Sequence, residues 1–248
     1  MLGIPESIEA CLFDLDGVLT RTAAIHARAW KDTFDQFLRT RADESGDPFR
    51  PFDLTTDYDE YVDGRPRIEG VRTFLDARGI TLPEGTDDDP TTAETVRGLG
   101  NRKNELLLER IRSDGVPIYE GSVRFVQAAQ RAGLRRAVVS SSKNTHEVLR
   151  AAELEGLFEV CIDGNVLERD GLQGKPAPDT YLAAARALGV APGAAAVFED
   201  AIVGVEAGRA GGFGFVVGVD RRGDADELRA HGADVVVADL EELLAADD

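Results

Sequence analysis

The feature that most constrains the fold is a series of short apolar runs that alternate with helix-like segments. Each run has the length and composition of a strand buried on both faces of a sheet. Each helix-like segment ends at a glycine, where helices often end. This alternation predicts βαβ units and an α/β fold, with a Rossmann-like, doubly wound parallel sheet as its core. The apolar runs lie at residues 10–14, 136–140, 158–163, 195–200, 213–219 and 234–238.

A long segment between the first two apolar runs breaks this alternation. Residues 22–112 contain helical patterns but no convincing strand. We therefore predict an inserted α-helical cap domain at 22–112 and a core domain formed by 1–21 and 113–248. Within the cap, residues 83–94 are acidic and rich in turn-forming residues, which is typical of a solvated surface loop.

Composition limits the partners of this chain. Its formal net charge of -18 argues against nucleic acid, whose phosphates most of this surface would repel, so an anionic substrate needs a local basic pocket. The two cysteines lie in apolar runs, which argues against a disulfide framework. No apolar run approaches the roughly 20 residues that span a bilayer, and the N-terminus lacks a signal-peptide pattern. We expect a cytoplasmic protein without a membrane partner.

Two aspartates directly follow the first predicted strand. Asp14 ends the strand, Asp16 comes two residues later, and a glycine allows a sharp turn. Ligands of open α/β sheets bind outside the carboxyl ends of the strands, and two close carboxylates call for a compensating cation. A carboxylate that attacks phosphorus forms an acyl phosphate, while a second one can act as acid and base. The alternative is a turn with two capping aspartates.

Three further segments place polar side chains after predicted strands or in loops. VVSSSKN at 138–144 offers hydroxyl groups at a helix N-terminus, which is also consistent with simple helix capping. GKPAPD at 174–179 contains one of only four lysines in a chain with 24 arginines, so a specific role gains weight over a solvated side chain. VFED at 197–200 ends a strand in two adjacent carboxylates, which suit magnesium or a helix cap.

Together these four segments resemble, in order, the motifs of the haloacid dehalogenase superfamily. The resemblance covers essentially the whole chain and implies a Mg²⁺-dependent phosphotransferase. Asp14 is then the nucleophile and Asp16 the general acid and base, while Ser140 binds the phosphoryl oxygens and Lys175 neutralises charge. The implied metal ligands are Asp14, Asp16 through its backbone carbonyl, Glu199 and Asp200.

The inserted segment resembles the C1 cap of the β-phosphoglucomutase subfamily. AIHARAW at 24–30 is similar to a segment whose histidine couples cap closure to acid and base chemistry. VDGRPRIEG at 62–70 is similar to a loop that holds the distal phosphate, and NRKNE at 101–105 to a substrate-specificity loop. For each of these, ordinary surface or core residues are the alternative. The implied substrate-binding residues are Thr22, His26, Trp30, Gly64, Arg65, Arg67, Lys103, Asn104, Ser141, Ser142 and Asn144.

The resemblance implies isomerisation of β-glucose 1-phosphate to glucose 6-phosphate through a bisphosphate, by a monomer or weak dimer. An enzyme that uses a bisphosphate intermediate must bind a phosphate group at each end of it. A second anion pocket, formed by Arg67 and Lys103, would therefore favour a mutase over a phosphatase. The alternatives are a sugar-phosphate phosphatase that uses water as acceptor, and a non-catalytic metabolite-binding protein. Arg21 stands before Thr22 where the family often has Asp, and the acidic loop is extra, which puts the identity of the sugar in doubt.

Overall fold

The computed structural model describes residues 2–244, so residues 1 and 245–248, which the prediction assigns to the core, lie outside the described residues. The chain divides into two compact units, a core of 1–21 with 116–248 and a cap of 22–115. The predicted second boundary, after residue 112, falls inside α3 (Val96–Asp114).

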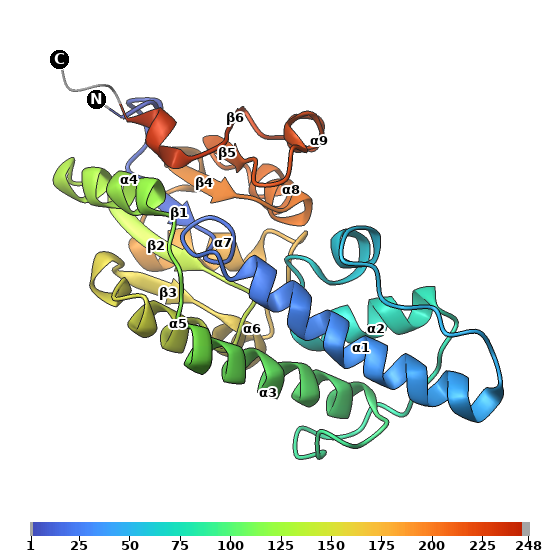
Figure 1. The fold of residues 1–248 in the computed structure, drawn as a ribbon. Coiled ribbons are helices and arrows are strands. Elements are labelled where there is room, and N and C mark those ends of the chain that lie inside the picture. The colour runs from blue at the N-terminus through green and yellow to red at the C-terminus, as the bar shows by residue number, and fades with distance from the viewer. Residues whose placement is uncertain (1, 245–248) are drawn as a thin grey trace. The chain divides into compact units, whose positions relative to one another are not determined.

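The core contains a six-stranded parallel sheet with the order β3-β2-β1-β4-β5-β6 (Figure 1). All six predicted apolar runs form strands, so the α/β prediction is confirmed. The first strand, β1, lies between β2 and β4, and this places the carboxyl ends of these three parallel strands next to one another. The strands are β1 (Ala10–Phe13), β2 (Arg135–Val139), β3 (Val160–Ile162), β4 (Ala195–Glu199), β5 (Phe215–Val219) and β6 (Val235–Val237).

Helices cover both faces of this sheet. On one face, alternate strand residues such as Ala10 and Leu12 join an apolar cluster with α7 (Asp179–Leu188), α8 (Ile202–Ala210) and α9 (Ala225–Ala230). On the other face, Phe13 of β1 stacks on Phe198 at 4.6 Å and meets Phe125 of α4 (Glu120–Arg131) edge-on at 6.2 Å. Burial on both faces explains why the strands are almost uniformly apolar.

Two short core helices escape the sequence patterns. These are α6 (Gly164–Asp170) and α9, of seven and six residues, too short to establish a helical period. Asp163 caps the N-terminus of α6, and its side chain accepts hydrogen bonds from the N–H groups of Asn165 and Val166. The helix α5 (Thr145–Ala151) ends before Glu153, whose positive φ of 58° lies outside the helical region.

The cap is helical, as predicted. It contains α1 (Ala23–Ser45), a π-helical turn (Tyr58–Val62), α2 (Arg67–Ala77) and α3. Aromatic side chains from different segments fill its interior: Trp30 stacks on Phe34 at 5.2 Å, and Phe34 lies 4.0 Å from Phe74. The cap therefore has its own hydrophobic core.

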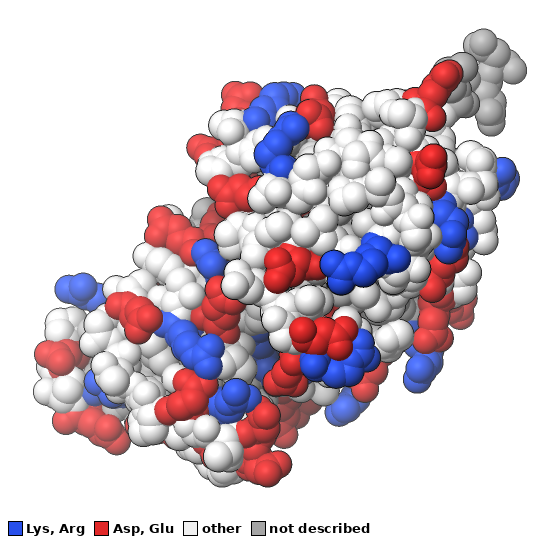
Figure 2. Space-filling model, turned by 180° about the vertical axis from the view of Figure 1, so that it is seen from behind, with Lys and Arg blue, Asp and Glu red and all other residues white. Residues whose placement is uncertain are grey.

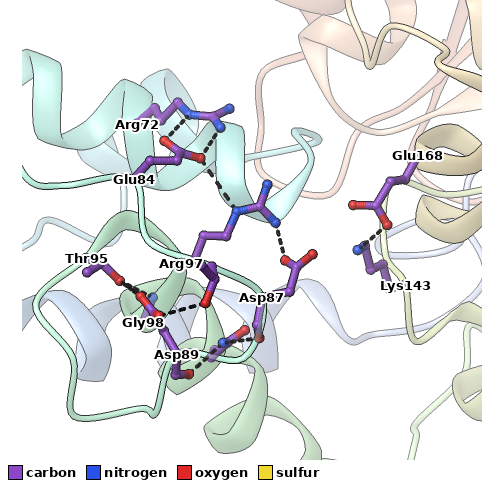
Figure 3. A network of polar contacts seen from close by, with 11 residues as sticks. Arg72, Glu84, Asp87, Asp89, Thr95, Arg97, Gly98, Lys143 and Glu168 are labelled. Atoms are coloured by element: carbon purple, nitrogen blue, oxygen red, sulfur yellow. Dashed lines mark hydrogen bonds and ion pairs between the residues drawn. The ribbon is translucent and has the colours of Figure 1, made fainter.

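The acidic loop, residues 83–94, is exposed but tied to its neighbours (Figure 3). Glu84 forms ion pairs with Arg72 of α2 and Arg97 of α3, and Arg97 also pairs with Asp87. Asn101 of α3 donates hydrogen bonds to two carbonyl oxygens of the loop. The predicted solvated loop is thus an ordered strap across two cap helices.

Charged groups of both signs are mixed over the face seen in Figure 2. The net charge of -18 is therefore not gathered into one continuous acidic patch on that face. Among residues 2–244, no helix combines the length and the apolar character needed to cross a bilayer.

Candidate active site

Sheet topology brings three of the predicted motifs to one edge. Asp14 directly follows β1, Ser140 follows β2, and Glu199 ends β4. The N–H group of Asp14 still donates to the carbonyl oxygen of Phe198, at 3.0 Å, so the parallel pairing of β1 and β4 continues up to this point. These side chains consequently lie at the carboxyl ends of adjacent strands, where open α/β sheets bind their ligands.

Lys175 joins two of these carboxylates. Its Nζ lies 2.5 Å from Oδ1 of Asp14 and also forms an ion pair with Glu199. Lys175 is 1% exposed, and Glu199 is fully buried. The hydroxyl group of Tyr181 donates to Oε1 of Glu199 at 2.7 Å, and the Tyr181 ring lies under the ammonium group at 5.2 Å. A buried lysine with these partners is a fixed positive charge directly beside Asp14.

The positive charge of Lys175 does not balance the negative charges of the buried carboxylates around it. Burial alone lowers the pKa of Lys175, but the carboxylates of Asp14 and Glu199 raise it above its ordinary value, so Lys175 stays charged. Burial raises the pKa of Asp14 well above its ordinary value, and Lys175 offsets only part of this effect. Burial and the carboxylate of Glu199 also raise the pKa of Tyr181, which keeps its hydroxyl proton. Ionised Asp14 therefore needs a further cation beside it.

The acidic cluster is suited to a divalent ion. Oxygens of Asp14, Glu199 and Asp200 lie within 4.8 Å of one another. When all three are ionised, Lys175 leaves two net negative charges, which one divalent cation balances. Hard carboxylate oxygens are the ligands that Mg²⁺ prefers. The side chain of Asp16 does not belong to this group within the described part of the chain, and the use of its backbone carbonyl as a ligand stays a prediction.

The serine segment after β2 forms a compact turn. Ser140 is 2% exposed, and its Oγ accepts a hydrogen bond from the N–H group of Ser142 at 3.1 Å. Oγ of Ser142 in turn accepts from the N–H group of Asn144, where α5 begins. Ser141, Ser142 and Asn144 are half-buried. Oγ of Ser140 is thus held at the same sheet edge as Asp14.

In the cap, three of the predicted substrate-binding residues meet. Nζ of Lys103 on α3 lies 3.1 Å from Nδ1 of His26 on α1 and 5.0 Å from the centre of the Trp30 ring. Lys103 is 4% exposed, and Trp30 is 3% exposed. Trp30 thus packs against the Lys103 side chain, and its contact with the substrate stays a prediction.

Gly100 allows a close approach between α2 and α3. A Cβ atom on Gly100 would lie 2.7 Å from Cδ1 of Ile68 and 3.6 Å from Nε of Arg67. Gly100 and Lys103 are three residues apart on α3 and share one face of the helix. Arg67, the first residue of α2, therefore lies against the face of α3 that carries Lys103.

The remaining predicted cap residues lie before α1 and α2 and in the middle of α3. Arg65 forms an ion pair with Glu69 at 3.6 Å, and the positive φ of Gly64, 67°, turns the chain before α2. Thr22 is buried at the start of α1, and Asn104 is half-buried next to Lys103.

Comparison with known proteins decides the family. Residues 8–212 match the family model "haloacid dehalogenase-like hydrolase". The chain belongs to this family. It is 55% identical to a β-phosphoglucomutase of Mycobacterium bovis, over 98% of this chain and 94% of the relative. The haloacid dehalogenase-like hydrolases are enzymes, and the predicted superfamily is confirmed.

Two solved structures of the family share the fold along nearly the whole chain. A β-phosphoglucomutase from Clostridium difficile is 26% identical, with a TM-score of 0.74 over 96% of this chain and 93% of its own. A CbbY protein from Rhodobacter sphaeroides, solved with xylulose 1,5-bisphosphate, is 26% identical, with a TM-score of 0.70 over 95% of this chain and 96% of its own.

Two residues of this haloacid dehalogenase-like hydrolase escape the sequence motifs. Tyr181 lies on α7, and nothing in its sequence context signals the hydrogen bond to Glu199. Arg221, in the loop after β5, donates to the carbonyl oxygen of Gly17 at 2.8 Å. It is one of 24 arginines, so its sequence context does not single it out.

Proposed function

We propose that this enzyme isomerises a sugar phosphate, in the manner of a β-phosphoglucomutase, by passing the phosphoryl group through Asp14. The buried contact of Asp14 with Lys175 at the carboxyl end of β1 carries this proposal. The 55% identity to a β-phosphoglucomutase over nearly the full length supports the substrate, β-glucose 1-phosphate, and the product, glucose 6-phosphate.

In the first half of the reaction, a carboxylate oxygen of Asp14 attacks phosphorus of a bound bisphosphate. An O–P bond forms on Asp14, the bond from phosphorus to the sugar oxygen breaks, and Asp16 gives its proton to that oxygen. In the second half, Asp16 takes the proton of a sugar hydroxyl, which attacks the aspartyl phosphate and releases Asp14. The hydroxyl that is phosphorylated in the second half is not the one freed in the first, so the sugar phosphate is isomerised while no net proton or phosphate is consumed.

The charges around Asp14 support this chemistry. Lys175 balances part of the negative charge of Asp14 and of the phosphoryl group it receives. We propose that the oxygens of Asp14, Glu199 and Asp200, with the backbone carbonyl of Asp16, hold Mg²⁺. When bound, Mg²⁺ would supply positive charge to the phosphoryl oxygens and lower their repulsion toward the attacking carboxylate. Ser140 would donate its hydroxyl proton to a phosphoryl oxygen.

The cap residues supply the proposed grip on the other end of the bisphosphate. Arg67 suits a phosphate group because its guanidinium group can donate two parallel hydrogen bonds. Lys103, which lies beside His26, adds a second cation. Gly64, Arg65, Asn104, Ser141, Ser142 and Asn144 remain proposed contacts of the sugar phosphate, as does Thr22. We further propose that the enzyme works in the cytoplasm as a monomer or weak dimer.

The test separates a mutase from a phosphatase. The enzyme is incubated with Mg²⁺, β-glucose 1-phosphate and a trace of glucose 1,6-bisphosphate, while glucose 6-phosphate and free phosphate are measured together. The proposal predicts glucose 6-phosphate without matching free phosphate. Release of one phosphate per sugar consumed would identify a phosphatase instead. Asp14→Asn should abolish either activity, and a fully active Asp14→Asn variant would exclude an aspartyl phosphate.

A further inference from the structure

Arg221 connects the loop after β5 to the turn that follows Asp14. The loop is built by Asp220, whose carboxylate accepts hydrogen bonds from the N–H groups of Arg222, Gly223 and Asp224. Partial burial acts to raise the pKa of Asp220, but these backbone donors lower it overall, so the carboxylate stays charged and keeps the loop closed. The closed loop fixes the direction in which Arg221 leaves the sheet.

The guanidinium group of Arg221 uses all of its hydrogen-bond donors. Its Nε donates to the carbonyl oxygen of Gly17 at 2.8 Å, and one terminal nitrogen donates to the carbonyl oxygen of Val18 at 3.3 Å. The group also lies over the ring of Tyr119, with its Cζ 3.5 Å from the ring centre. The side chain is only 12% exposed. Its remaining acceptors are Oγ of Ser122, the carbonyl oxygen of Ala238 and Oδ2 of Asp239.

The peptide that Arg221 holds lies against a predicted metal ligand. Gly17 has a φ of 99°, and a Cβ atom at this position would lie 1.8 Å from Oδ2 of Asp200. The N–H group of Gly17 donates to the carbonyl oxygen of Thr20 at 2.8 Å, which closes the turn. Gly17 also directly follows Asp16. A small displacement of Gly17 would therefore change the placement of both Asp16 and Asp200.

We infer that Arg221 is a positioning residue for phosphoryl transfer: it fixes the peptide after Gly17 and thereby keeps Asp16 and Asp200 in register with Asp14. This rests on the proposed function, and it holds for a mutase and a phosphatase alike. Lysine cannot replace Arg221, because a single ammonium group cannot reach acceptors spread over three segments of the chain in the planar pattern of a guanidinium group.

The experiment compares Arg221→Met with Arg221→Lys and with a matched control, Arg209→Met. Arg209 also donates two hydrogen bonds to one carbonyl oxygen, that of Gly232, at 3.1 and 2.7 Å. Gly232 precedes β6, so this contact lies at the amino ends of the strands, away from Asp14. Three quantities are measured for each variant: kcat and KM for the sugar phosphate, the Mg²⁺ concentration at half-maximal rate, and hydrogen exchange in the metal-free protein.

For Arg221→Met we expect kcat to fall by about 10- to 100-fold, since small displacements of catalytic groups have effects of this size. The Mg²⁺ concentration at half-maximal rate should rise, and KM should change by less than about threefold, because no proposed sugar contact moves. Exchange of the amide hydrogens of Gly17, Leu19 and Thr20, which donate to carbonyl oxygens inside this turn, should accelerate at least about tenfold. Arg221→Lys should fold normally and still show the loss of kcat.

Arg209→Met should keep the kcat and the turn exchange of the wild type. If it lost kcat as Arg221→Met does, or if Arg221→Met kept wild-type kcat and turn exchange, the positioning role would be refuted. A wild-type enzyme that moves no phosphoryl group would instead overturn the proposed function, and the exchange data would still report whether Arg221 orders the turn.

Discussion

Replacement of Gly17 by alanine tests whether the turn after Asp14 controls the predicted metal site. The new Cβ atom would lie 1.8 Å from Oδ2 of Asp200, whereas ordinary contact begins at 3.4 Å. The carboxylate of Asp200 must therefore retreat by about 1.6 Å, the difference between these two distances. Mg²⁺ requires oxygen ligands close to 2.1 Å, so a displacement of this size removes Asp200 from the set of ligands.

Gly133→Ala is the matched control. Gly133 also has a positive φ, 78°, but a Cβ atom there would meet nothing within 4 Å. Alanine at a positive φ costs about 1–2 kcal/mol in either position. We therefore expect both variants to lose about this much free energy of unfolding. Only Gly17→Ala should also need at least about tenfold more Mg²⁺ for half-maximal rate, a loss typical of disturbed metal ligands.

The assay measures the initial rate of glucose 6-phosphate formation as a function of Mg²⁺ concentration, together with urea unfolding of both variants. A Gly17→Ala enzyme with the Mg²⁺ dependence and kcat of the wild type would show that Asp200 does not hold the metal in this position. Equal losses of activity in the two variants would trace the effect to general destabilisation.

Three further predictions concern charge. The pKa of Asp14 is raised in the folded protein, so the stability that Asp14 contributes is present below the ordinary pKa of 3.8 and is lost as pH rises through the raised pKa. Asp14→Asn should therefore raise the melting temperature measured in EDTA at pH 7.5, by about 2–4 °C for each kcal/mol of unfolding free energy gained. The same variant should no longer be stabilised by Mg²⁺. Glu84→Gln removes the ion pairs with Arg72 and Arg97, and urea unfolding should show a loss of at most about 1 kcal/mol of unfolding free energy in 20 mM salt and nearly none in 500 mM salt. Glu168→Gln, the control, removes a single exposed ion pair with Lys143 and should cost less than about 0.5 kcal/mol. Burial raises the pKa of Cys161 to about 12, so iodoacetamide should alkylate it at pH 8 about 10³-fold more slowly than a free cysteine, and rapid labelling would contradict this.

The sequence predicts the sheet well because its strands are buried on both faces. Such strands must be apolar along their length, and this signal needs no knowledge of distant residues. The sequence also points to Lys175 as a candidate site residue, since a lysine stands out in a chain that has only four. The short helices α6 and α9 could not, because six or seven residues do not define a helical period.

Contacts between distant segments account for what the sequence does not reveal. The hydrogen bond of Tyr181 on α7 depends on where β4 ends, which its own segment does not encode. The contacts of Arg221 join four segments that are far apart in the chain, and no local pattern encodes them. The acidic loop is similar: its composition predicts exposure, and its ion pairs with α2 and α3 appear only when the cap helices are packed.

The chain leaves and re-enters the core through two paired segments. Thr20 forms an isolated antiparallel bridge with Ile118, and the N–H group of Arg21 donates to the carbonyl oxygen of Pro117 at 2.8 Å. A segment inserted between such paired ends can be lengthened, shortened or exchanged by recombination without disturbing a single strand of the sheet. Evolution can thus remodel the inserted helical segment while the sheet edge that carries Asp14 stays intact.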